Sequence, residues 1–316
     1  MTVGRAAAEA AVFDPRCHLR PEELAGLRRR SNLRAWLLVA GNWATIAAVL
    51  APLALAPGPL TFLLALLLLP GRQLGLAVLM HEAGHGTLFA SARLNRWIGQ
   101  WCCALPLFND LPSYAAGHRE HHRMAGTRDD PDLPNYAAYP VDRASFRRKV
   151  LRDLSGRTGL RLLGFVARGA AGGVTAGASR SGTRPFRQML LVQAVLLTCS
   201  VLAGMPWLYA AWLGSFLTTF MLVIRLRQIA EHAAVPDLYH PDPRKNTRTV
   251  DAPWWQRWLL APNGVNFHLE HHLLPGVPCY RLRRLHRLLR ERGALEGVPD
   301  TRSYGAVLRA VVVQAG

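Results

Sequence analysis

Cysteine is scarce in this 316-residue chain, and its number and spacing argue against a fold held by disulfide bonds or by a structural zinc ion. The five cysteines are an odd number and include no Cys-x-x-Cys pair. A disulfide framework needs paired cysteines, and a structural zinc site takes closely spaced ones. We therefore expect reduced or buried thiols at positions 17, 102, 103, 199 and 279.

Acidic residues are also few, and this shortage first suggests a nucleic-acid partner. Asp and Glu number 20 against 38 Lys and Arg, which gives a net charge of +18 and a pI near 11.1. Such a charge is typical of proteins that bind nucleic acid. Half of the residues are apolar, however, which excludes low-complexity disorder. The placement of the basic residues, described below, argues against nucleic acid.

Charge is missing altogether from long apolar runs, and these runs predict membrane spans. Residues 36–56 contain no charged side chain. At ~1.5 Å per residue this helix would reach about 31 Å, which is enough to cross a bilayer. Further runs at about 60–80, 189–202 and 208–224 have the same apolar character. We predict an all-α integral membrane protein with four transmembrane helices. A soluble core of hydrophobic helices is the alternative.

The second run contains a polar interruption, Pro70-Gly71-Arg72-Gln73. A polar group in a membrane helix needs a partner in the protein or in water. We therefore expect a kinked helix with Arg72 turned inward or toward an interface.

The basic residues are confined to three parts of the chain, which predicts the orientation. All but three of the 38 Lys and Arg lie in residues 1–35, 119–187 and 225–316, and the turns near residues 57 and 204 carry none. By the positive-inside rule, both termini and the central segment face the cytoplasm. We expect two transmembrane hairpins in a single domain, 1–316, with a helical cytoplasmic cap formed by residues 1–35, 81–188 and 225–316.

Two basic segments have apolar residues at helical spacing. They are residues 145–165, which include Leu151 and Leu154, and residues 279–292, which include Leu282, Leu285 and Leu289. Each could be an amphipathic helix on an anionic leaflet, or a solvated basic face packed on the cap. The pattern leaves both interpretations open.

The histidines carry the chemistry. Nine of the twelve fall in four places, which are His81-x-x-x-His85, His118-x-x-His121-His122, His232, and His268-x-x-His271-His272. Residues i, i+3 and i+4 share one face of a helix, so each box can direct its imidazoles to a single point. The four places lie at the cytoplasmic ends of spans or in the cap. Nine imidazoles are too many for one ion but suit two, and imidazole binds Fe, Zn, Cu or Ni.

The first box also matches the zinc-protease motif HExxH, in which Glu82 would be the general base beside His81 and His85. Such a protease needs one further ligand, and the two HxxHH boxes would then have no role. A metal transporter would place its ligands at mid-membrane instead of at the cytoplasmic edge. Both alternatives are therefore less favoured.

These motifs resemble the membrane-bound fatty acid desaturase superfamily, which includes acyl desaturases, lipid and carotenoid hydroxylases, and ketolases. The similarity covers most of the chain. It extends beyond the boxes to Arg72-Gln73, Pro131-Asp132, Asn246-Thr247-Arg248-Thr249, and Asn266 with Pro275 and Pro278.

The resemblance implies a non-haem di-iron centre that uses O₂ as co-substrate. Its ligands would be His81, His85, His118, His121, His122, His232, His268, His271 and His272. The implied reaction is desaturation of an acyl chain in a lipid, an acyl-CoA or a carrier-bound fatty acid. The alternative is hydroxylation or ketolation of a lipid or carotenoid, because substrate positioning separates these outcomes.

Other residues are candidates to support the ligands. Acyl-CoA desaturases of this superfamily carry an asparagine one turn before the isolated histidine, where this chain has Gln228. Carboxylates near the boxes could accept hydrogen bonds from the imidazole rings. The candidate residues are Gln228, Glu120, Glu270, Asp132 and Asn266, with Glu82, Glu231 and Asp129 as further carboxylates.

Electrons must come from a separate protein. The chain has no GxGxxG after a predicted strand and no haem-binding His-Pro-Gly-Gly segment. We expect a ferredoxin or a cytochrome-b5-type donor with its reductase. The bias to arginine, with only Lys149 and Lys245 as lysines, is typical of a GC-rich genome. We therefore expect a bacterial inner membrane, with the active site on the cytoplasmic side and membrane lipid as a further partner.

Overall fold

The structure is a computed structural model that describes residues 13–168 and 183–314, and it is mostly helical in these ranges. Parts of the predicted cap, at residues 1–12, 169–182 and 315–316, lie outside the described residues.

The helices before the second gap are α1 (Pro21–Arg28), α2 (Asn32–Leu55), α3 (Pro59–Gly84), α4 (Ala92–Ile98), α5 (Leu111–Met124), α6 (Arg143–Leu154) and α7 (Arg157–Ala167). Those after it are α8 (Thr183–Leu202), α9 (Pro206–Leu217), α10 (Thr219–His232), α11 (Pro243–Asn246), α12 (Trp254–Leu260), α13 (His268–Leu273), α14 (Cys279–Glu291) and α15 (Tyr304–Val311). Shorter helical turns lie at Pro15–His18, Gly99–Ala104, Leu105–Leu107, Leu133–Asn135 and Pro262–Gly264. The two-residue strands β1 (Val141–Asp142) and β2 (Val312–Val313) pair in parallel.

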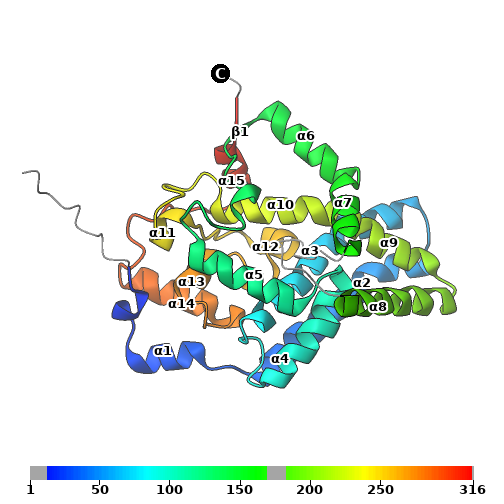
Figure 1. Cartoon of the computed structure of the whole chain (residues 1–316), viewed down its shortest axis with the longest axis horizontal. Coiled ribbons are helices and arrows are strands. Elements are labelled where there is room, and N and C mark those ends of the chain that lie inside the picture. The colour runs from blue at the N-terminus through cyan, green and yellow to red at the C-terminus, as the bar shows by residue number, and fades with distance from the viewer. Residues whose placement is uncertain (1–12, 169–182, 315–316) are drawn as a thin grey trace, which may run out of the picture.

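The prediction of four helices long and apolar enough to span a membrane is confirmed. They are α2, α3, α8 and the pair α9–α10, which together cover Pro206–His232. In Figure 1 the turn between α2 and α3 and the turn between α8 and α9 lie at the same end of the molecule, on the right. Both α3 and the pair α9–α10 continue past the last residue of the apolar runs that predict them. The polar last turns of α3 and α10 therefore contain His81 and His232.

Helix α3 is the central element and runs unbroken across Pro70. It packs against α2, α5, α9, α10 and α12. Proline has no backbone N–H, so it leaves the carbonyl of Leu66 without its usual helical donor. The hydroxyl of Thr219, the first residue of α10, donates to that carbonyl at 2.7 Å. A side chain of α10 therefore replaces the missing bond in α3.

The polar interruption in α3 points into the protein, as expected. Arg72 is buried, donates to the backbone carbonyl of Trp258, and stacks on the Trp258 ring with its guanidinium carbon 4.3 Å from the ring centroid. Gln73 donates to the carbonyl of Trp212 at 2.9 Å and accepts from the Ser215 hydroxyl at 2.9 Å. These partners satisfy the Gln73 amide and part of the Arg72 guanidinium, which lipid could not do.

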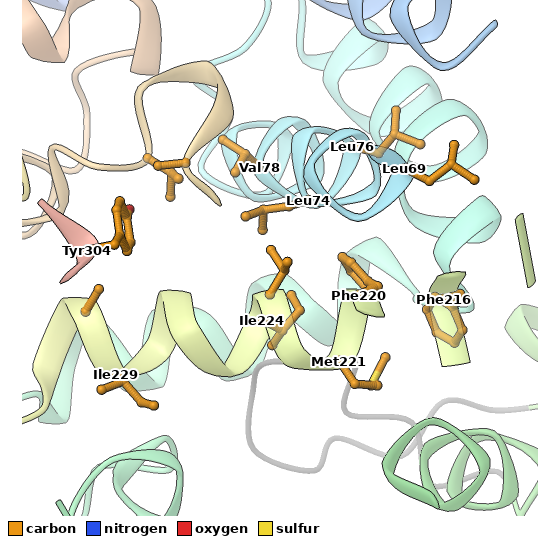
Figure 2. Packing of buried hydrophobic residues seen from close by; sticks show 14 of the residues in the cluster. Leu69, Leu74, Leu76, Val78, Phe216, Phe220, Met221, Ile224, Ile229 and Tyr304 are labelled. Carbon is orange, nitrogen blue, oxygen red and sulfur yellow. The ribbon is translucent and has the colours of Figure 1, made fainter. Parts of the chain in front are cut away.

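An apolar core joins α3 to α10, as Figure 2 shows. Leu74 of α3 faces Phe220 and Ile224 of α10, and all three side chains are at most 4% exposed. Each such side chain contributes roughly 1.5–3 kcal/mol when it is fully buried. This packing fixes the ends of α3 and α10 relative to each other.

The two basic amphipathic segments differ in the structure. On α14, Leu282, Leu285 and Leu289 are at most 2% exposed, in a cluster with Leu27 and Phe267. Of the two interpretations left open for this segment, packing on the protein is therefore correct.

The other segment forms two helices, α6 and α7, separated at Gly156, whose φ of +79° favours glycine. Leu151, Leu154 and Leu160 on these helices are 40–59% exposed. Contact with a leaflet stays a prediction for α6 and α7.

Candidate metal centre

Four elements bring all nine box histidines to one place. His81 lies in the last turn of α3, and His85 caps that helix. His232 is the last residue of α10. The others come from α5 (His118, His121, His122) and from α13 (His268, His271, His272).

The histidines form two groups, and within each group the ring nitrogens that face one another all lie within 4.8 Å. The five-histidine group contains His81, His85, His118, His122 and His271. The four-histidine group contains His121, His232, His268 and His272.

Each HxxHH box divides its side chains between the two groups, so the expectation that a box aims all its imidazoles at one point is wrong. On α5, His118 and His122 join the five-histidine group while His121 joins the other. Neighbouring residues on an α-helix differ by about 100° in direction, because one turn takes 3.6 residues. His121 and His122 are therefore directed to different points.

The Nε2 atoms face one another at short range. In the five-histidine group, the His122 Nε2 lies 3.0 Å from that of His118 and 2.9 Å from that of His271. In the four-histidine group, the His268 Nε2 lies 2.9 Å from that of His232 and 3.0 Å from that of His272. Converging nitrogen lone pairs of this kind suit a metal ion.

Burial keeps most of these rings neutral. It lowers the pKa of His118, His268, His271 and His272 well below the usual value, and neighbouring histidines lower these pKa values further. Burial also lowers the pKa of His122 to about 2. A neutral imidazole keeps the lone pair that a metal needs.

In the four-histidine group, three rings have an oxygen near Nδ1. The His121 Nδ1 donates to a carboxylate oxygen of Asp130 at 2.8 Å. Burial lowers the pKa of His121, but the hydrogen bond to Asp130 and nearby acidic charges outweigh it and raise the pKa overall. The His232 Nδ1 donates to the backbone carbonyl of Asn246 at 3.1 Å. The His268 Nδ1 lies 3.5 Å from a carboxylate oxygen of Glu231.

The five-histidine group has fewer such contacts. The His81 Nδ1 lies 3.3 Å from a carboxylate oxygen of Glu82, outside hydrogen-bonding geometry. Within the described residues, both nitrogens of His81, the Nε2 of His85 and the Nδ1 of His271 are buried without a hydrogen-bond partner. Unpartnered buried nitrogens cost free energy, and a bound metal ion would remove that cost at those it ligates.

The predicted supporting residues have different surroundings. An oxygen of Asp132 lies 3.8 Å from the His121 Nδ1, and Gln228 lines a small pocket beside His121 and His232. Glu270 is buried, but it contacts His286 and Thr249 instead of a ligand ring.

The last two predicted supporting residues, Asn266 and Glu120, contact groups other than the histidines. Asn266 donates to the Val250 carbonyl at 3.1 Å. The Glu120 carboxylate is half exposed and pairs with Arg123, so the contact expected from Glu120 to an imidazole is not present.

Asp130 is the carboxylate that contacts a box histidine most closely among the described residues, and it is not among the residues predicted from the sequence. The signal was present, because Asp130 stands between the two aspartates that were named, Asp129 and Asp132. Asp129 is exposed and Asp130 is 4% exposed, and it also accepts a hydrogen bond from the Tyr136 hydroxyl. The conformation of this loop determines which of the three aspartates reaches His121, and sequence spacing does not specify that conformation.

Comparison with known proteins identifies the family. The sequence model of the family described as fatty acid desaturase matches residues 56–304, a range that contains all nine histidines. The chain belongs to the fatty acid desaturase family.

Relatives of this desaturase-family chain include both desaturases and a ketolase. The dihydrorhizobitoxine desaturase of Bradyrhizobium elkanii is 28% identical over 281 residues, which cover 82% of this chain and 76% of the relative. A β-carotene ketolase of Paracoccus sp. (strain PC1) is 26% identical over 232 residues, 72% of this chain and 81% of the relative. An sn-1 oleoyl-lipid 12-desaturase of Picosynechococcus is 25% identical over 313 residues, which cover 89% of this chain and 84% of the relative.

These relatives are oxidoreductases, and so is this member of the fatty acid desaturase family. The family implies a lipid-type substrate and a redox partner in general, and with the four apolar helices it indicates a membrane protein. The zinc-protease alternative has no support from these matches. Its motif residues His81 and His85 are also part of a five-histidine group, where the protease would need only one further ligand.

Proposed function

We propose that the protein is a membrane di-iron enzyme that uses O₂ and two external electrons to introduce a double bond into an acyl chain. The acyl chain belongs to a lipid, an acyl-CoA or a carrier-bound fatty acid. The observation that carries the proposal is the convergence of nine histidines, seven of them buried, in groups of five and four, in a chain of the fatty acid desaturase family.

The residues present fit two iron ions. His81, His85, His118, His122 and His271 would hold one iron, and His121, His232, His268 and His272 the other. When bound, the two irons would supply the activation of O₂ that breaks an unactivated C–H bond. Neutral imidazoles also bind zinc or copper, so the choice of iron rests on the family.

The protein's own groups orient the ligand rings. Asp130 accepts from the Nδ1 of His121, and the Asn246 carbonyl accepts from the Nδ1 of His232. Each hydrogen bond leaves the Nε2 lone pair of the ring directed into the four-histidine group. Burial of the rings excludes bulk water from the place where a C–H bond would be broken.

A second candidate function is oxygen insertion, as a hydroxylase or ketolase of a lipid or carotenoid. The β-carotene ketolase among the relatives favours it. Both reactions need the same ligands, and they differ in how the substrate is placed.

The membrane arrangement that goes with this function has two hairpins, α2–α3 and α8 to α10. The histidine groups and both termini face the cytoplasm of a bacterial inner membrane. A single domain spans residues 1–316. A ferredoxin or a cytochrome-b5-type protein with its reductase would deliver electrons from that side. The uncharged turns at residues 56–58 and 203–205 and the basic remainder support this orientation.

Metal analysis and lipid profiling test the proposal together. Purified protein should contain two irons per chain, and one zinc per chain would overturn the proposal. Lipids of an expressing host are then compared by mass spectrometry with those of a host expressing His118→Ala. Loss of two hydrogens from an acyl chain supports desaturation, gain of oxygen supports the second candidate, and identical lipid profiles would contradict both.

A further inference from the structure

A groove of about 460 Å³ lies outside the two histidine groups, between α2, α3, α12 and α14. We call it the arginine groove, because Arg72 from α3, Arg257 from α12 and Arg283 from α14 line it. Its walls include Trp254 and Trp258.

The charge of the arginine groove is unbalanced. Its lining contains no Asp or Glu, and no ion pair among the described residues includes Arg72, Arg257 or Arg283. Three cations that line one groove without a carboxylate favour binding of an anion, since guanidinium pairs well with phosphate and carboxylate.

Arg72 is the strongest sign of a missing ligand. The residue is only 7% exposed, and its Nε is buried without a hydrogen-bond partner. Its other contacts, with the Trp258 carbonyl and ring, carry no negative charge. A buried cation without a counter-ion is unfavourable, and an anion in the groove would remove that cost.

Two exposed tryptophans at or beside the groove suit a membrane surface. Trp254 is 73% exposed and Trp255 is 50% exposed, at the start of α12, which packs on the apolar helix α3. Exposed tryptophans beside a membrane helix are typical of the head-group layer. The groove would therefore open where lipid head groups lie.

We propose that the arginine groove binds the phosphate or carboxylate head group of an anionic membrane amphiphile. The proposal rests on the proposed function for the membrane orientation. The groove also adjoins the five-histidine group. Its wall residue Cys279 donates its N–H to Glu82 at 2.8 Å, and another oxygen of Glu82 lies 3.3 Å from His81. An amphiphile bound there would be anchored beside the metal centre.

The test uses the full-length protein in a neutral detergent and native mass spectrometry to count retained lipids. The probes are oleate, dioleoylphosphatidylglycerol and dioleoylphosphatidylcholine, offered separately. Wild-type protein should retain one molecule of an anionic probe about tenfold better than phosphatidylcholine, the ratio expected if one charge-assisted contact is gained. Retention of oleate alone assigns a carboxylate ligand, and retention of phosphatidylglycerol alone assigns a phosphate.

Two variants and a matched control locate the site. Arg257→Gln/Arg283→Gln should lose the tenfold preference. Arg287→Gln changes an exposed arginine one turn further along α14, outside the groove, and should keep it. Arg72→Lys keeps the charge but removes the guanidinium, and should weaken anion retention while iron content stays normal. An unchanged preference in the double variant, or no preference in wild type, would overturn the proposal.

The outcomes separate this proposal from the proposed function. Protein that retains anionic lipid but changes no lipid in the host contradicts only the reaction. Protein that changes host lipids but shows no preference for anionic probes contradicts only the arginine groove.

Discussion

The two histidine groups differ in how their rings are held. In the four-histidine group, Asp130 and the Asn246 carbonyl each accept a hydrogen bond from a ring, and Glu231 lies near a third. In the five-histidine group, both nitrogens of His81 and the Nδ1 of His271 have no hydrogen-bond partner in the described structure. Hydrogen bonds therefore orient two rings of the four-histidine group, whereas His81 and His271 have no such acceptor at Nδ1.

This difference suggests unequal affinities for metal. A ring that is already oriented loses less freedom when it binds a metal, and an acceptor at Nδ1 makes the ring more basic. We expect the four-histidine group to hold its iron more tightly, and the following predictions test that ranking.

Removal of one ligand from either group should have the largest effect. His272→Ala in the four-histidine group and His85→Ala in the five-histidine group should each lower iron content and abolish lipid conversion, because both irons are needed. Iron analysis and host lipid profiles measure this. Full activity in either variant would show that the substituted histidine's group is not part of the metal centre.

Asp130→Asn should have the next largest effect, because it weakens the acceptor that orients His121. Metal affinity should fall about 10–100-fold, as is usual when such a partner is lost. The measurement is the rate of iron loss to a chelator. Asp129→Asn, at the exposed neighbouring position, is the control and should match wild type. Equal iron loss from the two variants would refute the ranking.

Glu82→Gln should affect folding more than metal binding. The same Glu82 oxygen accepts from the Cys279 N–H and from the Thr87 hydroxyl, both at 2.8 Å. Weakening these buried bonds should cost about 1–3 kcal/mol of unfolding free energy. A lower unfolding temperature with iron and lipid conversion retained is the expected result. Complete loss of activity in folded, iron-loaded protein would show a direct chemical role for Glu82.

Glu120→Gln should have the smallest effect. Glu120 pairs with Arg123 in solvent, and exposed pairs of this kind stabilise proteins little. Iron content, lipid conversion and unfolding temperature should all equal those of wild type. Iron loss in this variant would mean that the second box supports the metal centre from its exposed side as well.

The sequence predicted those features that follow from local periodicity. Apolar runs identified the four long helices, and the spacing of the boxes identified the nine histidines that converge. Periodicity could not show which leucine stripe would be covered. Leu285 on α14 is fully buried, whereas Leu151 on α6 is 55% exposed, although both lie in basic helices. That distinction depends on which distant segment packs there.

Sequence periodicity also could not show that Asp130, and not a neighbouring aspartate, contacts His121, because this depends on the conformation of a loop. The loop must first fold before one of three nearby carboxylates reaches His121, and spacing alone does not reveal which. The division of each box between the two groups differs in this respect, because the 100° step between neighbouring residues of a helix already directs adjacent histidines to different points.

Pro70 has a mechanical consequence for the metal centre. The hydroxyl of Thr219 on α10 closes the gap that Pro70 leaves in α3, so the two helices are cross-linked inside their apolar interface. One of these helices ends near His81 and the other at His232, which belong to different groups. The separation between the two groups therefore depends in part on a contact between α3 and α10 at a different point along both helices. This contact would limit changes in the spacing of the two groups whether or not a metal is bound.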